Sequence, residues 1–276
     1  MLIRLGFEIR HRFPQDTPML VTLNLHDSRR GDIAIAQELL LTPGVPLRQY
    51  HDGFGNICTR FVAPAGTLTL FSDAVVRDTG ATDDIALGAQ QVPVPMLPDE
   101  TLVYLLGSRY CETDKLMEQA WSLFGNTPLG WGRVQAICDY VHQRITFGYA
   151  FADATKGAAQ ALQEGRGVCR DFAHSAIALC RCMNIPARYC TGYLGDIGVP
   201  HSDAPMDFSA WFEAYLDGRW YTFDARHNTP RIGRVLVARG RDASDAAISN
   251  TFGANTLESF VVWCKETDDA TLSPRT

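Results

Sequence analysis

One cysteine of the chain lies in a setting that suits a nucleophile. Cys169 follows Gly165 and Gly167 closely, and the apolar residues after it recur at helical spacing. This pattern predicts that Cys169 occupies the first turn of a helix, where unpaired amide N–H groups and the helix dipole stabilise a thiolate. A lowered thiol pKa is what a nucleophilic cysteine requires, and the glycines would let the main chain approach a substrate. The alternative is a buried structural cysteine at a helix start.

A carboxylate stands at the end of a predicted hairpin further along the chain. Asp217-Gly218 separates two alternating segments, which predicts a tight two-residue turn. In that register Ser209 and Asp224 lie on one face of the hairpin as diagonal neighbours. His227 faces the other side unless the strand ends just after Asp224 and turns the imidazole back.

The remaining polar side chains near these segments are given structural or surface roles. His201 belongs to a loop before the hairpin that could fold over the site, whereas His174 lies five residues after Cys169 and should point away from it. Tyr149 is expected to pack into the core. The pair Asp83-Asp84 is too short and isolated for a calcium site and is expected to be solvated surface.

The elements that must position these residues follow two patterns. Residues 1 to 95 alternate in short segments separated by turn residues, which predicts an antiparallel β-sandwich. The proline-rich stretch 91–98 is expected to be an extended linker. Helical spacing predicts four helices, at residues 112–124, 132–145, 158–163 and 169–183. Strands are expected at 187–193, 209–216, 219–224 and 257–265, with an irregular region from 225 to 255 that holds a short helix near 241–247.

Composition sets limits on the class of protein. The chain has 276 residues, of which 46% are hydrophobic and 20% charged, and its net charge is −6. These values are typical of a globular protein of about two domains. An acidic balance without a dense basic stripe argues against nucleic acid as a partner. No stretch approaches the about 18 to 20 apolar residues of a membrane span, and the charged N-terminus does not read as a secretory signal, so we expect no membrane association and a cytoplasmic location.

The cysteines indicate neither a disulfide framework nor a metal site. The chain has eight of them, but it is long and rich in core residues, and no pair shows the Cys-x-x-Cys spacing of a zinc or redox site. We expect seven to be small buried hydrophobic residues and Cys169 to differ. No cofactor is expected.

Several blocks, in the right order, resemble the transglutaminase-like superfamily across roughly residues 115 to 228. They are Gly165-Arg166-Gly167-Val168-Cys169-Arg170-Asp171-Phe172-Ala173, Ile185-Pro186-Ala187-Arg188-Tyr189 with Gly192-Tyr193, Ala210-Trp211-Phe212-Glu213-Ala214-Tyr215-Leu216, and Phe223-Asp224. The resemblance implies an α+β fold, with a β-rich N-terminal domain at 1–95 and a papain-like core at 96–276 that carries a C-terminal extension. In the core, helices would pack on an antiparallel sheet.

The resemblance also assigns roles. Cys169 matches the family nucleophile, and Asp224 matches the acid that orients the base. The family has its catalytic histidine directly before Ala-Trp, where this chain has Ser209, and a serine hydroxyl cannot accept a proton as imidazole does. His227 is the candidate replacement base.

Two functions follow from this reading. The first is a cysteine amidase that acts on peptide or isopeptide bonds of a peptide or protein substrate through a thioester, which water or an amine then releases. The second is a scaffold that kept the fold, lost catalysis with the base, and binds a peptide or protein in the same cleft.

Overall fold

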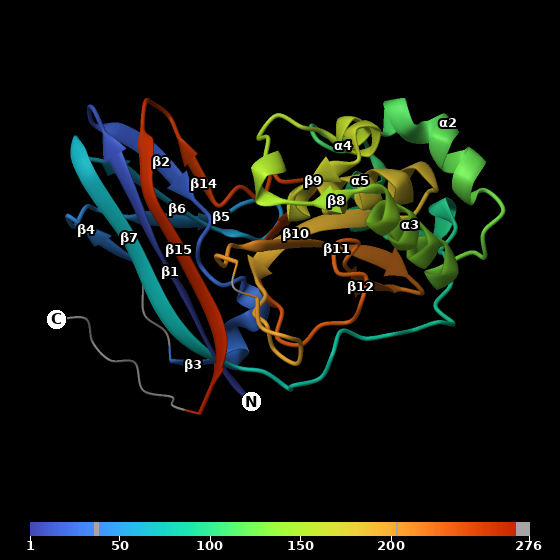
Figure 1. Ribbon diagram of the computed structural model, residues 1–276, viewed down its shortest axis with the longest axis horizontal. Coiled ribbons are helices and arrows are strands. Elements are labelled where there is room, and N and C mark those ends of the chain that lie inside the picture. The colour runs from blue at the N-terminus through green and yellow to red at the C-terminus, as the bar shows by residue number, and fades with distance from the viewer. Residues whose placement is uncertain (36–38, 203, 269–276) are drawn as a thin grey trace.

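Both ends of the chain contribute to a pair of facing antiparallel sheets. The computed structural model describes residues 1–35, 39–202 and 204–268 (Figure 1). One sheet has the strand order β15-β1-β7-β3, with β4 also paired to β7, and the other has the order β14-β2-β6-β5. Their strands are β1 Leu2–Phe13, β2 Thr17–Val21, β3 Ile33–Ile35, β4 Leu40–Thr42, β5 Arg48–His51, β6 Ile57–Ala63, β7 Gly66–Arg77, β14 Ser249–Thr251 and β15 Thr256–Thr267.

The alternating pattern of the first strand explains this layer. Ile3, Leu5, Phe7 and Ile9 of β1 are all buried, because side chains two residues apart share one face of a strand. Residues of β2 and β6 such as Met19 belong to the same core. The expected antiparallel β-sandwich is therefore present.

The C-terminal strands correct one part of the expected organisation. Residues 249–267 were assigned to an extension of the core, but β14 pairs with β2, and β15 pairs with β1 along the whole of that strand, from Leu2↔Thr267 to Arg12↔Thr256. The pairing partner of β15 lies more than 240 residues away, so the local pattern of β15 predicts a strand but not its sheet. The strand-rich part is thus completed by the C-terminal end of the chain.

The second part consists of helices packed on one antiparallel sheet, as expected. Its sheet has the order β12-β11-β10-β13, and α5 lies against β10 and β11 with α2, α3 and α4 around it. The strands are β10 Ala187–Tyr193, β11 Ser209–Leu216, β12 Arg219–Phe223 and β13 Val235–Gly240, and a small parallel pair is formed by β8 Thr146–Phe147 and β9 Arg166–Gly167. The helices are α1 Asp99–Leu102, α2 Thr113–Phe124, α3 Trp131–Arg144, α4 Ala158–Glu164 and α5 Cys169–Cys182, with 3-10 turns η1 Asp27–Asp32, η2 Val94–Met96, η3 Val103–Leu105 and η4 Tyr149–Phe151.

The region 225–255 differs from its expected structure. The short helix predicted near 241–247 is absent, and β13 and β14 are present in this region instead. β13 pairs with β10, from Tyr189↔Gly240 to Tyr193↔Val235. The local sequence does not reveal this strand because its stability comes from a partner that lies far away along the chain.

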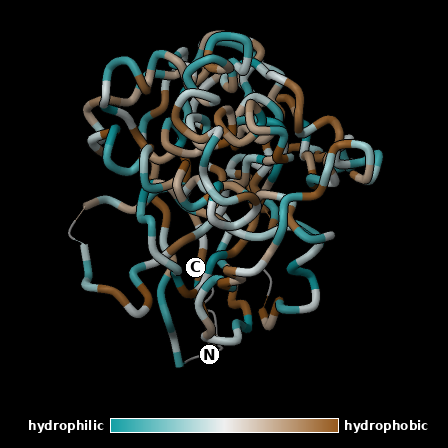
Figure 2. Tube along the Cα trace, turned by 90° about the vertical axis from the view of Figure 1, so that its right-hand side faces the viewer, coloured by the Kyte–Doolittle hydropathy of each residue, from teal (hydrophilic) through white to brown (hydrophobic). Residues whose placement is uncertain are grey.

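The trace coloured by hydropathy agrees with this arrangement of layers. In Figure 2 hydrophobic segments run through the interior and many hydrophilic segments lie in the outer loops. The central helix α5 is buried over nearly its whole length, from Asp171 to Cys182. Within the described residues, none of the helices has the length and apolar character that crossing a membrane requires.

Candidate active site

Cys169 is the first residue of α5, as its sequence predicts. The helix start is capped by Asp171, whose Oδ2 accepts a hydrogen bond from the Val168 N–H at 2.8 Å. A Cβ atom at Gly167 would lie 2.5 Å from that oxygen, and Gly165 has the left-handed conformation that ends α4. The two glycines therefore make room for the cap and end the preceding helix, rather than bringing the main chain close to a substrate.

The environment of the Cys169 thiol does not favour the thiolate overall. Burial raises its pKa to about 11. The guanidinium of Arg226 and a hydrogen bond from the Ala210 N–H oppose this rise, and the carboxylates of Asp207 and Asp224 add to it. The expectation of a lowered pKa is therefore wrong, because the rise that burial causes exceeds the lowering by Arg226 and by the Ala210 N–H. Cys169 is still the half-buried member of the eight cysteines; the other seven are buried.

Ser209 begins β11 and lines the same cavity as Cys169. The predicted hairpin register is confirmed, since Leu216 pairs with Arg219 and Phe212 with Phe223. Ser209 is 6% exposed, and its Oγ has no hydrogen-bond partner among the described residues. The residue that stands at the family histidine position is thus a buried hydroxyl that lines the same cavity as Cys169.

Asp224 and His227 are brought together by the end of β12. The strand stops at Phe223, and the Asn228 N–H donates to the Asp224 carbonyl at 2.8 Å, which closes a turn. This turn points His227 back, and its Nδ1 lies 2.8 Å from Asp224 Oδ2. Because an ionised carboxylate only accepts, Nδ1 carries the proton and Nε2 is left free to accept one. The structure thus shows the strand end that the sequence allowed as an alternative.

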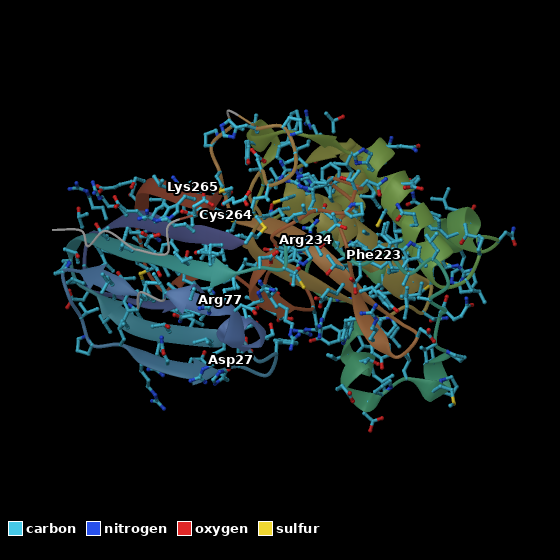
Figure 3. All side chains as sticks on the ribbon, turned by 90° about the horizontal axis from the view of Figure 1, so that it is seen from below. Asp27, Arg77, Phe223, Arg234, Cys264 and Lys265 are labelled. Atoms are coloured by element: carbon cyan, nitrogen blue, oxygen red, sulfur yellow. The ribbon has the colours of Figure 1, made fainter. Side chains whose placement is uncertain are left out.

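Arg234 binds the same Asp224 oxygen as His227. Its side chain is 7% exposed and donates to Asp224 Oδ2 at 2.9 Å and to Asp83 Oδ2 at 2.9 Å. Burial raises the pKa of Asp224, but Arg234 and His227 lower it more strongly, so that the pKa stays well below its usual range. Figure 3 labels Arg234 between the strand-rich part and Phe223 of the core.

The surroundings of Asp83 contradict the expectation that it is solvated surface. It belongs to the extended segment after β7 and was expected to be solvated, but its carboxylate also accepts the Arg231 N–H at 2.9 Å. Asp84 beside it is exposed and pairs with Arg219. A local sequence reading misses Asp83 and Arg234 because the three residues Asp83, Arg234 and Asp224 meet only in the folded chain.

A cavity of about 620 Å³ contains Cys169, Ser209 and His227 in its wall. The rest of its lining comes from both parts of the molecule: Phe147 and Tyr149 near β8, residues of the loop 194–208 that include Asp207, the basic residues Arg226 and Arg231, and residues 262–266 of β15. Tyr149 is 44% exposed, and its hydroxyl donates to the Pro205 carbonyl at 3.3 Å, so it lines the cavity and is not a core residue.

The other histidines lie apart from this group or at its edge. His201 is an exposed cavity residue whose Nδ1 lies 3.5 Å from Asp196. His174 is fully buried away from the cavity, where it stacks on Tyr110 and accepts the Ala243 N–H at 3.1 Å. Among the described residues, no group of three or more His, Cys, Asp or Glu side chains is arranged to hold a metal ion.

Comparison with known proteins agrees with the fold and with the order of these elements. The model of the transglutaminase-like superfamily core matches residues 122–225. An uncharacterized protein of Mycobacterium leprae is 36% identical over 74% of this chain and 75% of its own, and one of Mycobacterium tuberculosis is 30% identical over 76% and 74%. The chain belongs to the transglutaminase-like superfamily.

A solved structure shares the architecture of this chain over nearly its whole length. The crystal structure of "a Putative Cysteine Protease from Cytophaga hutchinsonii" has a TM-score of 0.83 and 30% sequence identity, and it covers 99% of this chain and 93% of its own. The likeness therefore includes the strand-rich part completed by β15 as well as the core.

Proposed function

We propose that this transglutaminase-like protein is a cysteine amidase that acts on peptide or isopeptide bonds. The observation that carries the proposal is the hydrogen bond from His227 Nδ1 to Asp224 Oδ2 at 2.8 Å, because His227 lines the cavity that holds Cys169. A nucleophile, an imidazole and an orienting carboxylate are the three groups that a cysteine amidase uses. Here the imidazole comes from His227, and Ser209 stands at the family position.

The proposed reaction has two stages. The Cys169 sulfur attacks the carbonyl carbon while Nε2 of His227 takes the thiol proton, and the electron pair of the C=O bond moves to the oxygen. The C–N bond then breaks, the leaving amine takes the proton from His227, and a thioester remains on Cys169. Attack by water restores the thiol and gives hydrolysis, and attack by a second amine gives transamidation.

The raised thiol pKa places particular weight on His227. With a pKa of about 11, little thiolate exists near neutral pH, so the proton must move to the base as the sulfur attacks. Asp224 keeps Nδ1 protonated, and Nε2 is therefore available for that proton.

The test uses unfolded casein as a mixed peptide substrate. The release of new amino groups reports hydrolysis, and the incorporation of dansylcadaverine reports transamidation. We expect one of these signals from the natural protein, none from Cys169→Ala, and a loss of about 10²- to 10⁴-fold in His227→Gln. His51→Gln, an exposed histidine paired with Asp27 outside the cavity, is the matched control. Equal activity in His227→Gln and His51→Gln would refute the role of His227.

Two observations favour a second function, a peptide-binding scaffold. They are the serine at the family histidine position and the raised pKa of Cys169. A scaffold would bind casein in the natural protein and in Cys169→Ala alike and would give neither amino groups nor dansylcadaverine incorporation. Mass measurement of the intact protein, which reveals an acyl group held on Cys169, separates the two functions.

A further inference from the structure

Arg226 is a cation in the wall of the cavity that contains Cys169. The Arg226 guanidinium lies over the Phe147 ring at 3.7 Å. The main-chain N–H of Arg226 donates to Asp224 Oδ1 at 2.9 Å. Both ends of the residue are therefore held, the main chain by the catalytic turn and the side chain by an aromatic ring.

Arg226 differs from Arg231 and Arg234 in its pairing with carboxylates. Arg231 and Arg234 are engaged with carboxylates, at 3.8 Å from Asp196 and at 2.9 Å from both Asp83 and Asp224. For Arg226, no ion pair within 4.0 Å is formed with any residue in the described part of the chain. Arg226 and Cys169 nevertheless line the same cavity, and the charge of the guanidinium lowers the pKa of the thiol.

The groups that face Cys169 from other elements are mainly acidic or neutral. Asp207 of the loop before β11 and Asp224 after β12 both disfavour a negative sulfur, and Ser209 carries no charge. His227 is bound to Asp224. The positive charge that can offset a charged sulfur therefore comes from Arg226, and from His227 once it has accepted a proton.

We propose that Arg226 stabilises the negative charge that develops at Cys169 during attack. This inference rests on the proposed function for its role in catalysis, because the charge is the one that forms as the thiol loses its proton. A fixed cation in a site shielded from water acts more strongly than one in solvent, and the Phe147 ring limits its movement. His227 becomes a cation only when it accepts the proton, whereas Arg226 carries a positive charge throughout.

Alkylation of Cys169 tests the inference without any substrate. The rate at Cys169 is followed by mass spectrometry of its peptide at pH 9, with neutral iodoacetamide and with anionic iodoacetate. In Arg226→Gln we expect slower alkylation by iodoacetamide, about tenfold for each unit by which the thiol pKa rises. We also expect the ratio of the iodoacetate rate to the iodoacetamide rate to fall severalfold, since the cation that attracts the anionic reagent is gone. Arg226→Lys should retain most of both values.

Two further variants distinguish the loss of the Arg226 charge from a general loss of structure. Phe147→Leu keeps the charge but removes the ring that holds it, so it should lower the rate ratio by less than Arg226→Gln does. Arg166→Gln is the matched control, because Arg166 also lies over an aromatic ring, Phe151 at 5.4 Å, but does not line the cavity. It should leave both values unchanged.

The outcomes separate this inference from the proposed function. Rates and ratios that are equal in the natural protein and in Arg226→Gln overturn the role of Arg226 even if casein is processed. A reduced ratio in Arg226→Gln, restored in Arg226→Lys, supports the charge effect even if no amidase activity is found. In that case the proposed function fails and the electrostatic role at the thiol remains.

Discussion

The Asp224 carboxylate and the His227 imidazole form a hydrogen bond of 2.8 Å although they are only three residues apart and follow the last residue of β12. The family pattern has its histidine on the neighbouring strand, where Ser209 stands. A turn after a strand thus provides the same contact that a diagonal pair across two strands would provide. The relationship makes Asp224 the fixed point of the site and allows its imidazole to come from a different segment.

The proposed role of His227 predicts that a histidine at position 209 can partly replace it. His227→Gln should lose activity on casein, and adding Ser209→His to that variant should restore part of it, since Asp224 can accept from an imidazole at either position. Initial rates of the single and double variants are the measurement. A double variant as inactive as His227→Gln, but equally well folded, would show that the Ser209 position cannot reach the thiol and the carboxylate together.

The raised pKa of Cys169 predicts its response to pH. Because the thiol pKa is about 11, alkylation of Cys169 by iodoacetamide should rise steadily from pH 7 and reach half of its maximum only near pH 11. Rates measured on the Cys169 peptide, with the denatured protein as the control, give the profile. A plateau already reached at pH 7 would contradict the dominance of burial at this thiol.

The lowered pKa of Asp224 predicts a loss of stability in acid. A carboxyl group whose pKa is lower in the folded than in the unfolded state stabilises the fold above the unfolded pKa, which is about 3.9, and this contribution is lost as the pH falls below it. Asp224→Asn should therefore be less stable than the natural protein at pH 7, and the difference should shrink between about pH 4 and pH 2. Melting temperatures across this range decide the matter, and a difference independent of pH would contradict the assignment.

The position of Arg234 between Asp83 and Asp224 predicts that its removal lowers the stability of the fold. Arg234→Gln removes the cation between two carboxylates, and breaking a buried ion pair from one side costs about 3 to 5 kcal/mol of unfolding free energy. Urea unfolding measures this cost. Arg219→Gln removes an exposed pair with Asp84 and should cost less than about 1 kcal/mol. Similar small losses in both variants would show that Arg234 does not secure Asp224.

Local pattern was sufficient for the elements that carry the nucleophile. The glycine-flanked Cys169 and the helical spacing after it predict the start of α5, and the alternation on either side of Asp217-Gly218 predicts β11 and β12 in their observed register. These features depend on residues close together in the chain, where the periodicity of side chains reports directly on the backbone. The sequence by itself also determined which cysteine differs from the rest.

Only the tertiary structure decided how the site is completed. The sheet joined by β15 and the ion pairs of Arg234 bring together segments separated by many residues, and no local pattern encodes such contacts. The direction of the Cys169 pKa was also decided there, since the helix start is visible in the sequence but the degree of burial is not. The chain therefore encodes the position of Cys169 locally, while packing selects the groups that set the pKa of its thiol and the residues that surround Asp224.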